Sequence, residues 1–140
     1  MTPCNCHALR KATRRVTQLY DHTLMPSGLR ATQFALLCVI EKLQPTSLLP
    51  LADSMVMDRA TLGHNLRPLQ AQGYLKLVVG QDRRSREVSL TKAGQKALEM
   101  AKPLWQQAQT VFEDEMSART AKELRAVLQQ VVERVTVDAE

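Results

Sequence analysis

Apolar residues recur at intervals of three and four through most of the chain, a spacing typical of helices with one buried face. The pattern predicts six helices, which cover approximately residues 4–25, 32–43, 47–55, 58–72, 91–116 and 120–135. Between the fourth and fifth helices, two short apolar and β-branched runs (75–79 and 86–90) flank a polar turn and predict a β-hairpin. This order describes a mainly α fold with a small β-wing, the winged helix-turn-helix.

Residues with strong positional preferences support these helix boundaries. Thr2 is expected to cap the first helix, and Asp58 to cap the fourth, for which Gly73 is the C-terminal stop. Thr120 and Glu123 have the spacing of a capping box and are predicted to start the sixth helix.

Basic residues concentrate in one quarter of the chain. Residues 58–92 hold seven Lys/Arg and three acids, a local net charge of +4 within a formal +5 for all 140 residues. A pI near 9.4 favours a polyanionic partner, nucleic acid ahead of membrane. No apolar run approaches the roughly 20 residues of a membrane span. The N-terminus lacks a hydrophobic signal core, so a cytoplasmic protein of one domain with no membrane partner is expected.

The fourth predicted helix has one apolar and one polar face. Leu62, Leu66 and Leu69 share a side and are predicted to join the core. The candidate DNA-contacting residues are Arg59, Ala60, Thr61, His64, Asn65 and Arg67. Small groups among them suit a thymine methyl, and the polar groups suit base edges or phosphates. A solvated surface is the alternative interpretation of this face.

The hairpin turn is rich in arginine. Asp82, Arg83, Arg84 and Arg86 are the candidate contacts there, with Arg84 expected to enter a narrow minor groove. Asp82 is expected to pair with the side chain of Arg84 or Arg86 and hold the tip in shape. Ordinary solvation of a basic turn is the alternative.

The two ends of the chain have the features of a dimer interface. The fifth helix spans about 25 residues, or roughly 37 Å. The sixth carries the apolar stripe Leu124, Leu128, Val131 and Val135, which needs a partner. We therefore expect residues 1–30 and 92–140 to form an intertwined homodimer, and residues 31–91 to form the DNA-binding lobe. A twofold dimer would set two recognition helices about one DNA turn apart, roughly 34 Å.

Several strings resemble the MarR (multiple antibiotic resistance regulator) family. They are the D-x-R of Asp82-Arg83-Arg84, the run Val88–Gly94, the segment Leu69–Leu75 and the run Met57–Leu62. The resemblance covers nearly the whole chain. It implies a homodimer that binds a pseudo-palindromic operator in double-stranded DNA, usually as a repressor.

The same resemblance implies a pocket between the DNA-binding lobe and the dimer helices, often for phenolic or other small aromatic anions, whose ligand releases the repressor. Its candidate lining residues are Tyr20, His22, Phe34, Cys38 and Trp105. Plain core packing is the competing interpretation of these residues.

Four further possibilities can be weighed from the remaining residues. Cys4 and Cys6 lie near a helix N-terminus, where thiolates are stabilised, so thiol-based redox sensing is an alternative mechanism; reduced, incidental cysteines are the favoured one. Cys4, Cys6 and His7 lack the usual spacing of a metal site, and no cofactor is expected.

An enzyme has little support, because the chain has no phosphate-binding glycine loop and no hydrolase motif. A winged-helix module that binds protein is disfavoured by the basic hairpin.

Overall fold

The computed structural model describes residues 2–137, which form six α-helices and three short strands. In chain order the elements are α1 (Asn5–Leu24), the 3-10 turn η1 (Met25–Ser27), α2 (Ala31–Leu43), β1 (Thr46–Ser47), α3 (Leu48–Met55), α4 (Arg59–Ala71), β2 (Leu75–Val79), β3 (Arg86–Leu90), α5 (Lys92–Met116) and α6 (Ala118–Arg134). The predicted helix order and both hairpin strands are confirmed.

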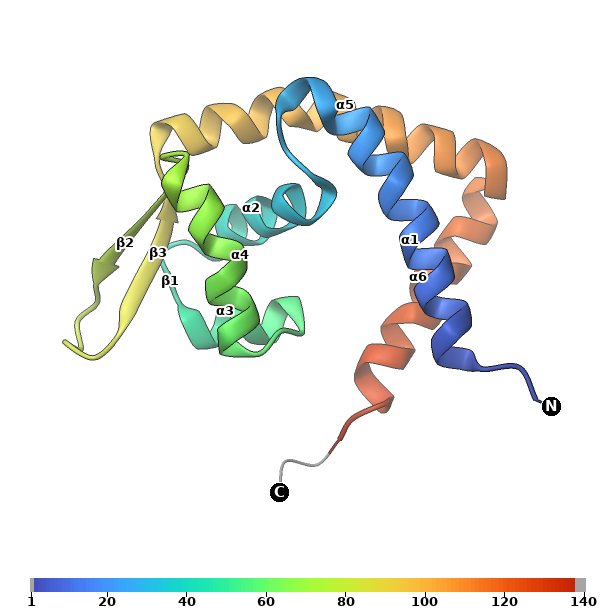
Figure 1. Ribbon diagram of the computed structural model, residues 1–140, viewed down its shortest axis with the longest axis horizontal. Helices are drawn as coiled ribbons and strands as arrows, with labels where there is room; N and C mark the ends of the chain where they lie inside the picture. Colours follow the sequence, from blue (N-terminus) through green and yellow to red (C-terminus); the bar gives the residue numbers. More distant parts are fainter. Residues whose placement is uncertain (1, 138–140) are drawn as a thin grey trace.

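The long helix α5 joins two parts of the molecule (Figure 1). At its N-terminal end lie α2, α3, α4 and the sheet, which together form a lobe; α1 and α6 descend from its other half. The N-terminal end of α1 and the C-terminal end of α6 lie away from α5.

The lobe is organised around leucine side chains from four helices. Leu37 of α2, Leu51 of α3, Leu69 of α4 and Leu98 of α5 are all fully buried in one cluster. The predicted apolar stripe of the fourth helix is therefore confirmed as core. Because Leu98 belongs to this cluster, the first half of α5 packs in the lobe. The predicted boundary between lobe and dimerisation helices, at residue 92, therefore lies at the start of a helix that belongs to both parts.

A three-stranded antiparallel sheet has β3 at its centre, in the order β1-β3-β2. Thr46 of β1 lies opposite Val88, and Leu75 of β2 lies opposite Leu90. Strand β1 was not predicted, because two residues are too few to produce an alternating pattern.

Two predicted helix starts were wrong. Cys4, rather than Thr2, caps α1, and its Sγ accepts a hydrogen bond from the backbone N–H of His7 at 3.3 Å. Ser117 caps α6, and its Oγ accepts from the backbone N–H of Thr120 at 3.1 Å. The capping box expected at Thr120 and Glu123 lies inside the helix, because serine three residues upstream provides the better cap.

The end of α4 is fastened to the start of α5. Gly73 has φ of 79°, a left-handed conformation that favours glycine after a helix. The Thr91 N–H donates to the Tyr74 carbonyl at 3.0 Å, and the Thr91 hydroxyl donates to the Gly73 carbonyl. Gly94 packs so closely that a Cβ there would overlap the Tyr74 backbone. The turn that follows α4 is therefore held against the first turn of α5.

Between residues 2 and 137, no single helix is long and apolar enough to cross a membrane. One bent helix pair, Asn5–Ser27 with Ala31–Leu43 at 74°, meets the length and composition criteria jointly.

Candidate nucleic-acid interface

Helix α4 begins with a strong cap and presents a polar face. The Asp58 Oδ1 accepts a hydrogen bond from the Thr61 N–H at 2.7 Å, and this bond lowers the pKa of the Asp58 carboxyl. The buried leucines fix the rotation of the helix. The opposite side is exposed and carries the predicted contacts Ala60, Thr61, His64 and Arg67, while Arg59 is exposed at the flank of the buried stripe.

Asn65, another predicted contact, lies differently from these residues. It is half-buried, and its amide donates to the Thr61 carbonyl at 2.7 Å. Helical spacing puts Asn65 at the flank of the buried stripe, but its bond to the Thr61 carbonyl was not predicted from the sequence.

The hairpin turn between β2 and β3, here called the wing tip (residues 80–85), is shaped by Asp82. Its Oδ1 accepts from the Arg84 N–H at 3.1 Å, and its carbonyl accepts from the Ser85 N–H at 2.9 Å. The expected ion pair between Asp82 and an arginine side chain is absent in the part of the chain that the structure describes. Asp82 instead orders the turn by accepting backbone N–H groups with its side chain and its carbonyl, and Arg83, Arg84 and Arg86 are exposed.

The wing tip and α4 are neighbours in the fold. A hollow of about 290 Å³, here called the wing hollow, lies between the start of α3, the start of α4 and the wing. Its lining includes Ser47, Leu48, Arg59, Asp82, Arg84 and Arg86. Candidate residues from the helix and from the hairpin thus share one concave surface.

The predicted ligand residues fall into three places. Phe34, Cys38 and Trp105 line a groove of about 450 Å³ between α2 and α5, here called the aromatic groove. The rings of Phe34 and Trp105 stack with centroids 5.9 Å apart. Tyr20 lies in a separate hollow, and the exposed His22 lines a third one near η1.

Lys102 also lines the aromatic groove, and no pattern in the sequence indicated it. The Lys102 Nζ lies 2.8 Å from a Glu99 oxygen and 3.2 Å from a Glu41 oxygen. These two carboxylates raise the pKa of Lys102. The pKa of the Cys38 thiol is raised, mainly because the thiol is partly buried and secondly because the negative charge of Glu41 is nearby. With two carboxylates against one ammonium, this region has no spare positive charge for an anionic ligand.

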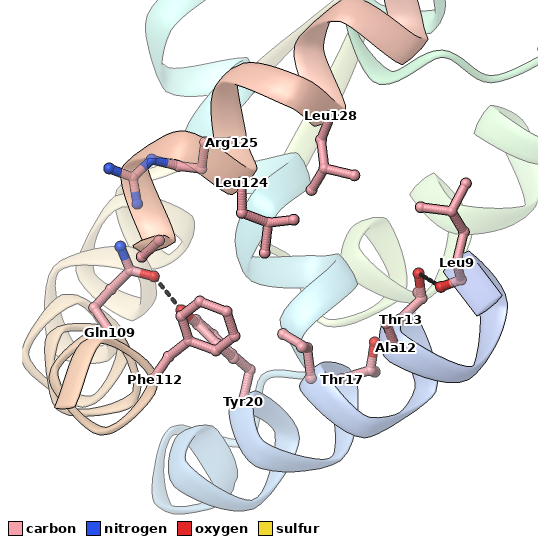
Figure 2. A pocket seen from close by; sticks show the side chains of 12 residues that line it. Leu9, Ala12, Thr13, Thr17, Tyr20, Gln109, Phe112, Leu124, Arg125 and Leu128 are labelled. Atoms are coloured by element: carbon pink, nitrogen blue, oxygen red, sulfur yellow. Dashed lines mark hydrogen bonds between the residues drawn. The ribbon is translucent and has the colours of Figure 1, made fainter. Parts of the chain in front are cut away.

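The hollow that contains Tyr20 lies between α1, α5 and α6 (Figure 2). Its volume is about 310 Å³, and its apolar lining includes Leu9, Phe112, Leu124 and Leu128. The Tyr20 hydroxyl donates to the Gln109 side-chain carbonyl at the rim. Further apolar residues on α6 and at its C-cap are exposed, namely Val127, Val132 and Val135.

Cys4 and Cys6 are both exposed at the start of α1, and Cys38 is half-buried. Among residues 2–137, no group of three or more His, Cys, Asp or Glu side chains is arranged to hold a metal ion.

Comparison with known proteins was made on sequence and on structure. No protein-family model matches the chain. The HTH-type transcriptional repressor NicR of Pseudomonas putida is 30% identical over 123 residues, which are 87% of this chain and 76% of NicR.

Solved structures extend the comparison over nearly the whole fold. The M. tuberculosis transcriptional regulator MosR, solved in complex with DNA, has a TM-score of 0.82 and 33% identity over 95% of this chain and 100% of that chain. A mutant MarR from E. coli, complexed with operator DNA, has a TM-score of 0.80 over 89% of this chain and 91% of that chain; at 22% identity it shows the shared fold. The chain belongs to the MarR family of winged helix-turn-helix transcriptional regulators.

Proposed function

We propose that the protein is a cytoplasmic homodimeric repressor that binds a pseudo-palindromic operator through α4 and the wing tip. A small aromatic or phenolic ligand in the aromatic groove releases it from DNA. The observation that carries the proposal is the shared concave surface of Arg59, Arg84 and Arg86, which unites the recognition helix with a basic hairpin.

Charge and exposure support duplex DNA as the partner. The outward face of α4 offers His64 and Arg67 at the spacing of one helical turn, which suits base edges and phosphates. The wing tip adds arginines that suit the negative potential of a narrow minor groove. MosR and MarR, which share this fold, are both known in complex with DNA.

Exposed apolar residues support a second copy of the chain as the other partner. Val127 and Val132 of α6 and its C-cap Val135 are each exposed by 48% or more, and α6 also lines the hollow between α1, α5 and α6, here called the α1/α6 hollow. Burying such a patch in a twofold interface is favourable, since each buried methylene contributes about 0.8 kcal/mol.

The aromatic groove supports a neutral aromatic effector. Its volume is within the usual range of small-molecule sites, and a ring can pack against Phe34 and Trp105. Because Lys102 is already neutralised, a neutral phenol suits this groove better than an aromatic carboxylate. A ligand held between α2 and α5 would shift α5, which is fastened to α4 through Tyr74.

The DNA-binding part is tested by fluorescence anisotropy on DNA from the gene's own upstream region. Arg84→Ala is expected to weaken operator binding by about 1–3 kcal/mol. Arg119→Ala is the matched control, because Arg119 lies on α6 with its side chain 90% exposed. An unchanged affinity for Arg84→Ala at fixed salt would remove the wing from the mechanism, and no binding by the wild type would favour a protein partner.

The effector part is tested by fluorescence, since Trp105 is the chain's single tryptophan. Phenols that release the operator should also quench Trp105, and Phe34→Ala should weaken both effects in parallel. Release without any change in fluorescence would place the effector outside the aromatic groove.

Thiol-based sensing is the second candidate, favoured by the exposure of Cys4 and Cys6 at the first turn of α1. It predicts that peroxide releases the operator and that Cys4→Ser or Cys6→Ser abolishes this release, with Cys38→Ser as the control. Binding that peroxide leaves intact would exclude it.

A further inference from the structure

The residues that line the wing hollow carry a net positive charge. Arg59, Arg84 and Arg86 line it, and Asp82 is the acidic residue in the lining. None of the three guanidinium groups has an ion-pair partner among residues 2–137. The Asp82 carboxylate already accepts the backbone N–H of Arg84.

The positive charges of three arginines that line one cavity repel each other, and an anion bound between them offsets this repulsion. Guanidinium groups also bind phosphate oxygens in pairs of parallel hydrogen bonds, which favours a phosphate group over a monatomic ion such as chloride. The lining therefore selects an anion with several oxygens.

The start of α3 contributes to the same cavity. Ser47 and Leu48 line it, and Ser47 caps α3 without using its side chain in a capping bond. The hydroxyl and the first backbone N–H groups of α3 are donors at the positive end of the helix dipole.

The position of the hollow indicates which anion it receives. A helix in the major groove and a hairpin in the adjacent minor groove lie on either side of one sugar–phosphate strand. The wing hollow lies between α4 and the wing, where that strand would pass. We propose that the wing hollow binds a single backbone phosphodiester of the operator, held by Arg59 from the helix side and by Arg84 and Arg86 from the wing side.

This inference rests on the proposed DNA-binding function and refines it. It assigns Arg59 to the DNA backbone instead of a base edge, so Arg59 contributes affinity without sequence preference. It also makes the helix and the wing grip the same phosphate, so their contributions to binding depend on each other.

The first test measures affinity over a salt series for the operator and for a scrambled duplex of equal length. Arg59→Ala is expected to weaken both duplexes by the same factor, roughly tenfold. It should also reduce the salt slope by about 0.9 per subunit, the effect of one phosphate contact. Arg59→Lys should keep the slope, and Arg119→Ala should change neither quantity.

The double variant Arg59→Ala/Arg86→Ala is expected to lose less affinity than the product of the two single losses, because both side chains contact one phosphate. A loss confined to the operator, with an unchanged salt slope, would assign Arg59 to a base and overturn the site. The site would also be overturned if the double variant lost affinity by a factor equal to the product of the factors lost by the two single variants.

The second test modifies the DNA and compares the wild type with Arg59→Ala. Neutral methylphosphonates are introduced one at a time along the operator backbone. One position in each half-site should weaken the wild type by a clearly larger factor than it weakens Arg59→Ala, which keeps only the two wing arginines at that phosphate. If every position weakens both proteins equally, the phosphate site is excluded while DNA binding stands; if the wild type binds neither duplex, the proposed function itself fails.

Discussion

At the scale of single residues, two glycines in this chain have opposite surroundings. Gly94 lies in the first turn of α5, where an added Cβ would overlap the backbone of Tyr74. Gly63 lies in the middle of α4, and an added Cβ there would meet nothing within 4 Å. The first glycine is required by a close approach of two backbones, and the second is not required by packing.

Gly94→Ala is therefore expected to destabilise the fold by about 1–3 kcal/mol, the usual effect of overpacking. Gly63→Ala is the matched control and should stabilise α4 by up to about 1 kcal/mol, the helix preference of alanine over glycine. Urea unfolding followed by circular dichroism measures both. Equal stabilities for the two variants would contradict the close approach of Gly94 to Tyr74.

Asp58 gives a pH-dependent prediction at the same scale. Its pKa is lowered by the Thr61 N–H, so the folded state binds its proton less readily than the unfolded state does. The stabilisation is fully present above the unfolded value, about 3.9, and is lost as the pH falls through the lower folded value. The advantage of the wild type over Asp58→Ser in thermal melting should shrink below about pH 4. An advantage that persists at lower pH would argue against the charged cap.

At the scale of elements, the wing depends on a backbone contact rather than on an ion pair. The Asp82 Oδ1 accepts the Arg84 N–H, and the Ser85 hydroxyl donates to the Asp82 carbonyl at 2.8 Å. An asparagine can make the same turn with its side-chain oxygen, but an alanine cannot.

Asp82→Ala is expected to weaken operator binding, because the turn that presents Arg84 loses its order. Asp82→Asn should bind at least as well as the wild type, since it keeps the acceptor and removes a negative charge near DNA. Anisotropy at one salt concentration distinguishes them. If Asp82→Asn weakens binding as much as Asp82→Ala does, the carboxylate charge is what matters and the backbone contact is not.

At the scale of the whole molecule, the apolar end formed by α1 and α6 should determine the assembly state. Leu128 lines the α1/α6 hollow and is still 37% exposed in the single chain (Figure 2). Gln130 lies about 200° further around α6 at 100° per residue, on the opposite side of the helix.

Leu128→Glu is expected to shift the protein from a dimer to a monomer of 15.7 kDa and to weaken operator binding, because two half-sites are no longer bound together. Gln130→Glu adds the same charge and should stay dimeric. Light scattering coupled to size-exclusion chromatography measures both masses. A Leu128→Glu protein that remains dimeric would place the interface elsewhere.

Local patterns in the sequence were sufficient for most elements. Periodicity located the six helices, and the strands 75–79 and 86–90 were predicted at their observed limits. Asp58, Gly73 and Thr91 occur at the helix ends where their conformational preferences place them. Periodicity and capping depend on neighbours within about one helical turn, so the sequence alone determines them.

Contacts between distant segments could be decided only by the tertiary structure. Arg59 and Arg84 are 25 positions apart, and no periodicity indicates that they line one cavity. The predicted ligand residues divided among three hollows, because helix packing and not composition decides which side chains meet. The sequence by itself determined the elements, their order and their basic surface. Only the fold decided which of these residues share a site, since that depends on how the elements pack in three dimensions.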